Sequence, residues 1–311
     1  MKFAMLYAAW EGEGWSSPIG FRNELVKRGH EIVHYNLYHR DGVVDYKGQI
    51  RKYSNEGINK FHADCRRGDM PDAVFLLDYG QFDAAQFDKK WIPEIVWITE
   101  QGDEPQSHQA QTPKALKADL VLSPDHRCVL RYHTMGVNAK FWTHCADQSL
   151  FYPRSDIPEM WDCVTTCGPR GGGLTEQIKS VLGDRFNNER YFYGEDHAKR
   201  LSMGKMVFQC SQFKEVTRRI FEGAACGKMV ITDRLPANTK LSELLVENDD
   251  IVYYDNVDDA INKIKFYSEN ETERKRIALN GYNKVIKEHS VSKRIDDLLI
   301  YIEEFKHDKL K

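Results

Sequence analysis

The chain has 311 residues, more than an ordinary single domain, so two domains are the expected organisation. Hydrophobic residues make up 41% and charged residues 29%, a globular balance that excludes a largely disordered chain. The net charge of −3 gives no overall attraction to nucleic acid or anionic membrane, and no apolar run reaches the length of a membrane span.

The N-terminal half alternates between strand-like and helix-like segments. Residues 2–9 predict a buried strand rather than a signal peptide, because the apolar run reaches Glu11 without a small-residue cleavage site. Helical spacing runs from Phe21 to a stop at Gly29. This alternation of strands and helices is typical of parallel strands joined by crossover helices. Further strands are predicted at residues 31–37, 73–78, 95–99 and 118–124, and a further helix at 125–136.

Residues 147–160 carry two prolines and no hydrophobic period, which indicates a linker between domains. A second alternating set follows and ends in a helical tail with a break near His289–Ser290. We therefore expect two α/β domains, at 1–153 and 154–290, and a C-terminal helix at 291–311 that could pack back on the first domain. In the second domain, strands are predicted at residues 161–167, 190–194, 206–211, 228–233 and 250–255, and helices at 174–183, 215–227 and 257–270.

The cysteines form no C-x-x-C pair, which excludes the spacing of a zinc ribbon. Their odd number and scattered positions are typical of reduced thiols in a cytoplasmic protein. We assign none of them a chemical role. The seven are Cys65, Cys128, Cys145, Cys163, Cys167, Cys210 and Cys226.

Residues 168–173, Gly-Pro-Arg-Gly-Gly-Gly, follow a predicted strand and open a predicted helix. The amides of Gly171 and Gly172 at a helix N-terminus could hold phosphate, and Arg170 could add a charge-assisted hydrogen bond. The loop is not a Walker A motif, because Leu174–Thr175 stands where Lys and Ser or Thr are required. From the loop alone, a glycine turn that binds nothing is an equally good interpretation.

The loop after the first predicted strand contains Gly12 and Gly14. A dinucleotide-binding fingerprint needs a third glycine at position 17, where the chain has Ser17, and no acidic residue closes the second strand. Nicotinamide binding is therefore disfavoured. A tight strand-to-helix turn that presents Gly14 and Trp15 to a cleft is what we expect instead.

Residues 217–227 combine two arginines and a glutamate with a run of small residues and a closing glycine. Glu222 follows Arg219 by three positions, so the two side chains share one face of a helix. One interpretation is a surface ion pair, which contributes little stability. The other is a ligand cradle, in which Glu222 accepts hydrogen bonds from ribose hydroxyls and Arg219 binds a diphosphate. The residues alone favour the ion pair.

The stretch 217–233, followed by 250–294, resembles the C-terminal domain of glycosyltransferases of the spore-maturation CgeB type. These belong to the retaining group exemplified by glycosyltransferase family 4, and the similarity covers most of 95–300. Two later family signals match Asn280–Tyr282 and His289–Arg294. The family pattern of arginine, glutamate, Cys-Gly and a strand ending in Thr-Asp is met by Arg219, Glu222, Cys226, Gly227, Thr232 and Asp233.

The resemblance implies a GT-B fold, in which two Rossmann-like domains face each other across a cleft. The N-terminal domain would take the acceptor and the C-terminal domain the nucleotide sugar, with Glu222 on the ribose and Arg219 and Arg170 on the diphosphate. The chain departs from the broader group at Lys214, which stands where the first of two glutamates is usual. Lys214 could approach the diphosphate instead. Retention of anomeric configuration is implied by the resemblance alone.

Catalysis must stabilise a leaving nucleotide diphosphate while an oxocarbenium-like centre develops, which fixed cations and amides can do without a metal. We therefore expect no metal, and no cofactor besides the nucleotide-sugar donor. Glu100 and Asp103 follow a predicted strand and could orient or deprotonate the acceptor hydroxyl; solvated loop charges are the alternative. His197 could lie near the base or phosphates, or on the surface.

The acceptor is open between a polysaccharide, a protein, a small metabolite and a hydroxylated base of phage DNA. For DNA, an aromatic and basic surface could be formed by Trp10, Trp15, Arg22, Lys27 and Arg28. For Lys27 and Arg28, the solvated face of an amphipathic helix is the default interpretation. Two other functions stay open. One is a nucleotide-sugar-binding module without transfer activity, which the missing first glutamate would indicate, and the other is a nucleotide-sugar epimerase. We expect a cytoplasmic protein of open oligomeric state.

Overall fold

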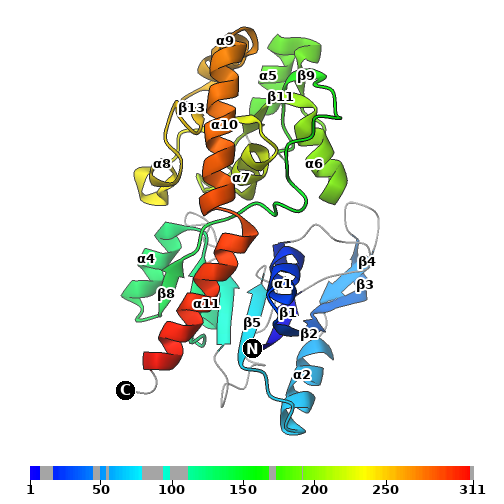
Figure 1. The fold of residues 1–311 in the computed structure, drawn as a ribbon, viewed down its shortest axis with the longest axis vertical. Helices are drawn as coiled ribbons and strands as arrows, with labels where there is room; N and C mark the ends of the chain where they lie inside the picture. The colour runs from blue at the N-terminus through cyan, green and yellow to red at the C-terminus, as the bar shows by residue number, and fades with distance from the viewer. Residues whose placement is uncertain are drawn as a thin grey trace. The chain divides into compact units, whose positions relative to one another are not determined.

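The computed structural model describes residues 1–7, 17–44, 50–53, 56–78, 94–98, 111–167, 173–190 and 192–308 (Figure 1). Contacts divide the chain into two compact units, Met1–Trp142 with Ile295–Lys311, and Thr143–Arg294. The sequence predicts boundaries after residues 153 and 290. In the structural division, residues 147–160 group with the second unit, and most of the C-terminal helix groups with the first.

The first unit is built on a six-stranded sheet in the order β2-β1-β5-β6-β7-β8, in which all neighbouring strands are parallel. Parallel neighbours need crossover connections, as the predicted alternation requires. The strands are β1 (Lys2–Tyr7), β2 (Glu31–Asn36), β5 (Ala73–Asp78), β6 (Glu94–Ile98), β7 (Leu120–Ser123) and β8 (Ala139–Phe141). Helices α1 (Ser17–Lys27), α2 (Glu56–Arg66) and α4 (His126–Thr134) and the antiparallel pair β3 (Tyr38–Val44) and β4 (Ile50–Tyr53) belong to the same unit.

The burial of β1 follows from its apolar composition. Residues Phe3 to Tyr7 are each at most 1% exposed, as in a strand that is covered on both faces. On one face, Ala4 and Leu6 pack in a core that includes Phe61 of α2 and Val129 of α4. The predicted helix stop is confirmed, because α1 ends just before Gly29, whose φ of +79° glycine adopts without strain.

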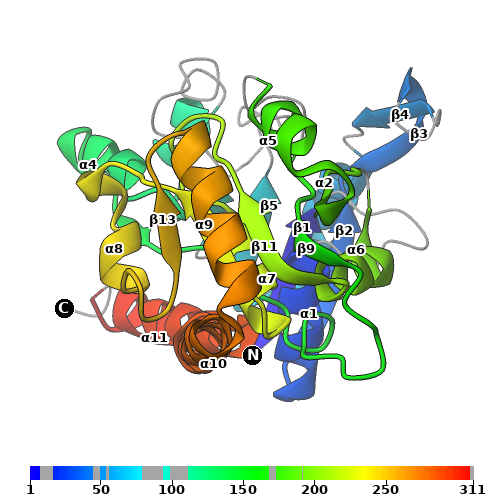
Figure 2. The same cartoon turned by 90° about the horizontal axis from the view of Figure 1, so that it is seen from above.

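The second unit has a five-stranded parallel sheet in the order β10-β9-β11-β12-β13. In Figure 2, β11 lies between β9 and β13. Helices α5 and α9 supply the core on one face, and α6 and α7 supply the core on the other. This arrangement is a doubly wound α/β fold. The strands are β9 (Trp161–Val164), β10 (Phe186–Asn187), β11 (Gly204–Gln209), β12 (Met229–Asp233) and β13 (Val252–Tyr254). The helices are α5 (Leu174–Leu182), α6 (Gly194–Ser202), α7 (Arg218–Ala225), α8 (Leu241–Leu244), α9 (Val257–Glu269) and α10 (Glu271–Glu288).

The tail breaks where the sequence predicted, between α10 and α11 (Val291–Asp308). At the break, Ser290 forms an isolated parallel bridge with Ala146, and Arg294 donates a 3.0 Å hydrogen bond to the carbonyl of Thr143. Further along α11, Asp296 forms an ion pair with Arg28 of the first unit's own helix α1. Within the described ranges, no helix is both long and apolar enough to cross a membrane.

Two predicted elements of the second unit are wrong in detail. The strand expected at 190–194 is absent from its described residues: Phe192 and Tyr193 lie outside any strand, and Gly194 begins α6. The ring of Phe192 instead packs under the Arg200 guanidinium at 4.5 Å, so tertiary packing overrides aromatic strand propensity. The helix expected from residue 215 begins at Arg218, because the Glu215 carboxylate accepts a 2.6 Å hydrogen bond from the backbone of Phe213 and belongs to the preceding turn.

Candidate functional site

A cavity of about 750 Å³ lies at the carboxyl ends of β11, β12 and β13. Its walls come from residues at the ends of these strands and directly after them, at 210–212, 233–236 and 254–257, together with Lys214 and with Leu174 at the start of α5. In doubly wound sheets, ligands bind outside the carboxyl ends of the strands. The cavity therefore occupies the place where this fold presents a ligand site.

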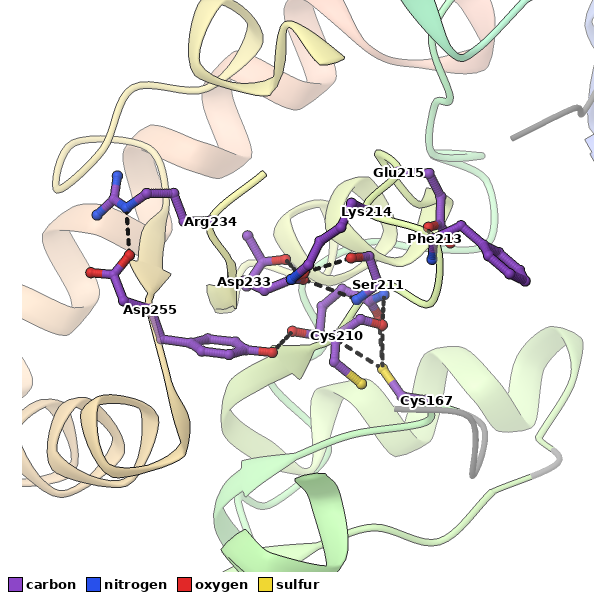
Figure 3. Close-up of polar contacts among 12 residues, drawn as sticks. Cys167, Cys210, Ser211, Phe213, Lys214, Glu215, Asp233, Arg234 and Asp255 are labelled. Atoms are coloured by element: carbon purple, nitrogen blue, oxygen red, sulfur yellow. Dashed lines mark hydrogen bonds and ion pairs between the residues drawn. The ribbon is translucent and has the colours of Figure 1, made fainter. Parts of the chain in front are cut away.

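Asp233, the last residue of β12, organises the polar wall of the cavity (Figure 3). It is 5% exposed and accepts hydrogen bonds from the backbone and hydroxyl of Ser211, at 2.9 and 2.5 Å. Lys214 completes the group with its ammonium 3.0 Å from the same carboxylate. A second ion pair on the wall joins Arg234 to Asp255 at 2.7 Å. Charge-assisted hydrogen bonds thus hold the opposite charges of the wall in fixed positions.

Lys214 combines an unusual backbone conformation with an accessible ammonium. Its backbone has a φ of +52°, in the left-handed region that costs a non-glycine residue free energy. Its side chain is 57% exposed although it lines the cavity and pairs with Asp233. The ammonium therefore keeps donor capacity toward the cavity after pairing once.

Glu222 is a buried carboxylate in the second turn of α7, only 2% exposed. Its Oε1 lies 2.7 Å from Nε of Arg218, whereas its Oε2 has no hydrogen-bond partner in the described part of the chain and lies 3.9 Å from Nδ1 of His197. Burial acts to raise the pKa of Glu222, but the nearby cations, Arg218 first, outweigh it and lower the pKa below its ordinary value. As far as the described residues go, the site therefore holds a charged carboxylate with one oxygen unsatisfied.

The interpretation of Glu222 and Arg219 as a surface ion pair is wrong. The partner of Glu222 is Arg218, four positions earlier, and the carboxylate is buried rather than on the surface. Among the described residues, the half-buried Arg219 has no hydrogen-bond or ion-pair partner. Its charge acts both on Glu222 and on Cys210 of the cavity wall, so the guanidinium lies near the carboxylate and near the cavity.

His197 is buried, so its placement on the surface is wrong. It is 8% exposed, its Nε2 lies 3.0 Å from the hydroxyl of Thr166, and the ring of Phe151 packs against it edge-on. Burial lowers the pKa of His197 to about 4, with the cations Arg219 and Arg218 acting in the same direction. At neutral pH the ring is therefore uncharged, and it would offer a hydrogen bond rather than a positive charge.

Several predicted site residues lie outside the described residues, so the structure does not place them. They are Gly14 and Trp15 on the acceptor side, Glu100 and Asp103, and Arg170, Gly171 and Gly172 of the glycine-rich loop. The last glycine of that loop is described: Gly173 adopts a left-handed φ of +77°, and α5 begins directly after it.

Sequence reasoning missed two parts of the site. Arg218 was not chosen as the partner of Glu222, although its i,i+4 spacing is as favourable on a helix as the i,i+3 spacing of Arg219. Asp233 was noted only as the end of a family motif, and its bonds to Ser211 and Lys214 depend on the neighbouring strand β11, which no local pattern identifies.

Comparisons with known proteins agree with this architecture. Residues 170–300 match the family model described as "Glycosyl transferase-like", which covers less than half of the chain. A search of the curated proteins found no match. Solved structures, by contrast, match over almost the whole chain.

One of these structures is sucrose-phosphate synthase from Thermosynechococcus elongatus, with 14% identity over 98% of this chain and 99% of that chain and a TM-score of 0.69. Another is Anabaena HepE in complex with UDP-glucose, with 13% identity over 98% and 100% and a TM-score of 0.68. A glycosyltransferase from Rickettsia africae has 12% identity over 98% of both chains and a TM-score of 0.62. At these identities the likeness establishes the fold, and the chain has the α/β fold of GT-B glycosyltransferases.

Proposed function

We propose that this protein is a glycosyltransferase that moves a sugar from a nucleotide-diphosphate donor to an acceptor hydroxyl. The observation that carries the proposal is Oε2 of Glu222, a charged and buried oxygen that has no hydrogen-bond partner among the residues the structure describes. Leaving such an atom unpaired costs free energy, and a ligand hydroxyl would satisfy it. The glycosyl transferase-like match of residues 170–300 includes this carboxylate and the cavity, which supports a sugar nucleotide as that ligand.

In this proposal Glu222 accepts hydrogen bonds from the donor ribose, and Arg218 keeps the carboxylate charged. Arg219 and Lys214 bind the diphosphate, together with Arg170 and the amides of the glycine-rich loop. Fixed cations of this kind stabilise the negative charge that develops on the leaving diphosphate, without reorganisation during the reaction. The HepE structure was solved in complex with UDP-glucose, so UDP-sugars are the first donors to test.

The finer parts of the proposal concern the acceptor and the stereochemistry. We assign acceptor binding to the N-terminal unit, with Gly14 and Trp15 near the acceptor and with Asp103 or Glu100 orienting its hydroxyl. The acceptor class is a polysaccharide, a protein, a metabolite or a hydroxylated base of phage DNA. Membership of the CgeB-type branch, retention of configuration, metal independence and a cytoplasmic location belong to the same proposal.

The test is a thermal-shift screen of UDP-, GDP-, ADP- and dTDP-sugars, because a ligand that binds only the folded state raises the melting temperature. Glu222→Gln removes the carboxylate charge at constant shape, and we expect it to abolish the shift. The matched control is Asp162→Asn. Asp162 is a buried carboxylate near the amino end of β9, whereas the cavity lies at the carboxyl ends of the strands, and it pairs with Lys205 at 2.7 Å. A Glu222→Gln protein that keeps the full shift would remove Glu222 from the donor site.

A second candidate is a nucleotide-sugar-binding module without transfer activity. The observation that favours it is Lys214, which stands on the cavity wall in place of the first glutamate of the broader group. Release of free nucleotide diphosphate from a bound donor, with or without an acceptor, would exclude this module. Conversion of the donor into its isomer without release would instead indicate an epimerase.

A further inference from the structure

Cys167 and Cys210 occupy facing positions just beyond the ends of two neighbouring strands. In the parallel register of β9 and β11, Cys163 pairs with Met206 and Val164 with Val207. The same offset, continued past the strand ends, brings Cys167 opposite Cys210. Neighbouring strands lie about 4.8 Å apart. Disulfides span Cα separations of about 4.4 to 6.8 Å, so this spacing suits a disulfide.

Side-chain contacts bring the two thiols together. The backbone N–H of Cys210 donates a 3.3 Å hydrogen bond to Sγ of Cys167, and the two thiols also interact with each other. Sγ of Cys167 lies 3.0 Å from Oε1 of Gln209, which fixes its direction. In Figure 3 the two sulfur atoms lie next to each other. A rotation of the side chains, rather than a movement of the strands, would therefore bring the sulfurs into bonding distance.

The other buried cysteines of the second unit differ from this pair. Burial raises the pKa of Cys145 and of Cys226 to about 12, and it raises the pKa of Cys163 as well, so these thiols are poorly reactive. Cys210, by contrast, is only partly buried and lines the cavity, where a small oxidant can reach it. The pKa of Cys167 falls to about 6, first because of its contact with Cys210 and then because of the Arg219 charge. The same contact and burial raise the pKa of Cys210, so Cys167 supplies the thiolate that such chemistry needs.

The pair is connected to the groups that line the cavity. Cys210 directly precedes Ser211, which holds Asp233 by two hydrogen bonds, and Asp233 in turn holds Lys214. Cys167 directly precedes the glycine-rich loop in the sequence. A covalent bond between the two sulfurs would therefore act on both chain segments that we assign to the donor diphosphate.

We propose that Cys167 and Cys210 form a reversible disulfide that lowers the affinity of this site for its nucleotide sugar. The effect on affinity rests on the proposed function, whereas disulfide formation does not. With hydrogen peroxide as oxidant, an S–S bond forms and the O–O bond breaks. The two thiols give up two protons and two electrons, and peroxide becomes two water molecules. A dithiol reductant reverses the step and is itself oxidised to a disulfide.

The first experiment maps the disulfide in the full-length protein. Reduced protein is treated with hydrogen peroxide, remaining thiols are alkylated, and unreduced digests are analysed by mass spectrometry. We expect a linked pair of peptides containing Cys167 and Cys210 that disappears after dithiothreitol. The pair should be absent from Cys210→Ser and present in Cys65→Ser, which removes the other partly buried cysteine. Complete alkylation of both cysteines after oxidation, or linkage of either one to a different cysteine, would overturn the proposal.

The second experiment compares donor affinity in the reduced and oxidised protein by calorimetry. We expect the oxidised protein to bind the nucleotide sugar about tenfold more weakly and to recover with dithiothreitol. Whatever its reduced affinity, Cys210→Ser should not respond to peroxide. Equal affinities in a protein whose disulfide is mapped would refute the regulatory role. Reduced protein that binds no nucleotide sugar would refute the proposed function and the effect on affinity, while the peptides still decide whether the disulfide forms.

Discussion

The two arginines before Glu222 have different roles: Arg218 stabilises the fold, and Arg219 is the one that we assign to ligand binding. Arg218 is in contact with the buried carboxylate and compensates its charge, whereas Arg219 has no ion-pair partner among the described residues. Removing one partner of a buried pair leaves an uncompensated charge, which is far more costly than losing an exposed charge. The neighbouring arginines should therefore respond differently to the same substitution.

We expect Arg218→Met to lower the free energy of unfolding by about 3 kcal/mol, because it leaves the buried Glu222 carboxylate without its ion-pair partner. Arg219→Met, the matched control, should change it by about 0.5 kcal/mol or less, yet weaken donor binding. Urea denaturation and donor titration measure the two effects. The cost of Arg218→Met should shrink when Glu222→Gln is present, and an additive double variant would contradict the pairing.

The lowered pKa of His197 predicts how the free energy of unfolding depends on pH. Its pKa falls from the ordinary 6.5 to about 4 in the folded protein, so between these values the unfolded chain binds the proton and the folded protein does not. Stability from this group is complete above pH 6.5 and is lost as the pH falls toward 4, by up to about 3 kcal/mol. Denaturation series at several pH values should show a shallower loss for His197→Gln. The exposed His307→Gln should keep the loss seen in the unchanged protein.

At the scale of elements, α10 depends on a close approach to the chain before β13. A side-chain carbon placed on Gly281 would lie 2.4 Å from the carbonyl oxygen of Asp250, which is closer than such atoms approach. In an exposed helix, a change from glycine to alanine stabilises. Here the backbone contact reverses the sign of that effect on stability, so this position needs glycine because of packing between elements rather than helix propensity.

We expect Gly281→Ala to destabilise the protein by about 2 kcal/mol, since α10 must move away from Asp250 to accept the methyl group. Lys287→Ala in the same helix, where the side chain is 81% exposed, should stay within about 0.5 kcal/mol. Thermal and urea denaturation provide the comparison. A stabilised Gly281→Ala variant would show that the contact does not limit the helix position.

The whole molecule is two α/β units, and α11 carries the chain from the second unit into the first. Three side chains of α11 from Ile295 onward, Ile295, Leu298 and Ile302, are at most 1% exposed and belong to the first unit. Burial of each such side chain contributes about 2 kcal/mol. The last helix is therefore part of the core of the N-terminal unit, although it is far from it in sequence.

We expect Leu298→Ala to destabilise the first unit by about 3 kcal/mol through the cavity it leaves. Hydrogen exchange should then accelerate in β1 and β7 but not in β11 and β12. Ile264→Ala, in the core of the second unit, should give the reverse pattern. Uniform acceleration in both units would show that they unfold as one.

How much the sequence predicted depends on how local each signal was. The strand at 73–78 was predicted with the bounds that the structure has, and the breaks at Gly29 and His289–Ser290 are confirmed. Apolar runs, helical spacing and helix-ending residues act over a few positions and can be read without the fold. The expected α/β fold with parallel sheets is confirmed as well, because alternating strands and helices leave few other arrangements.

By itself, the sequence determined the alternation of elements, the apolar strands and the identity of Glu222 as a residue of interest. Only the tertiary structure decided that this carboxylate is buried, that Arg218 rather than Arg219 pairs with it, and that Cys167 faces Cys210. The physical reason is that these contacts depend on strand order and on the direction in which a helix faces the sheet. Both arise from packing between distant segments, which no local pattern in the chain records.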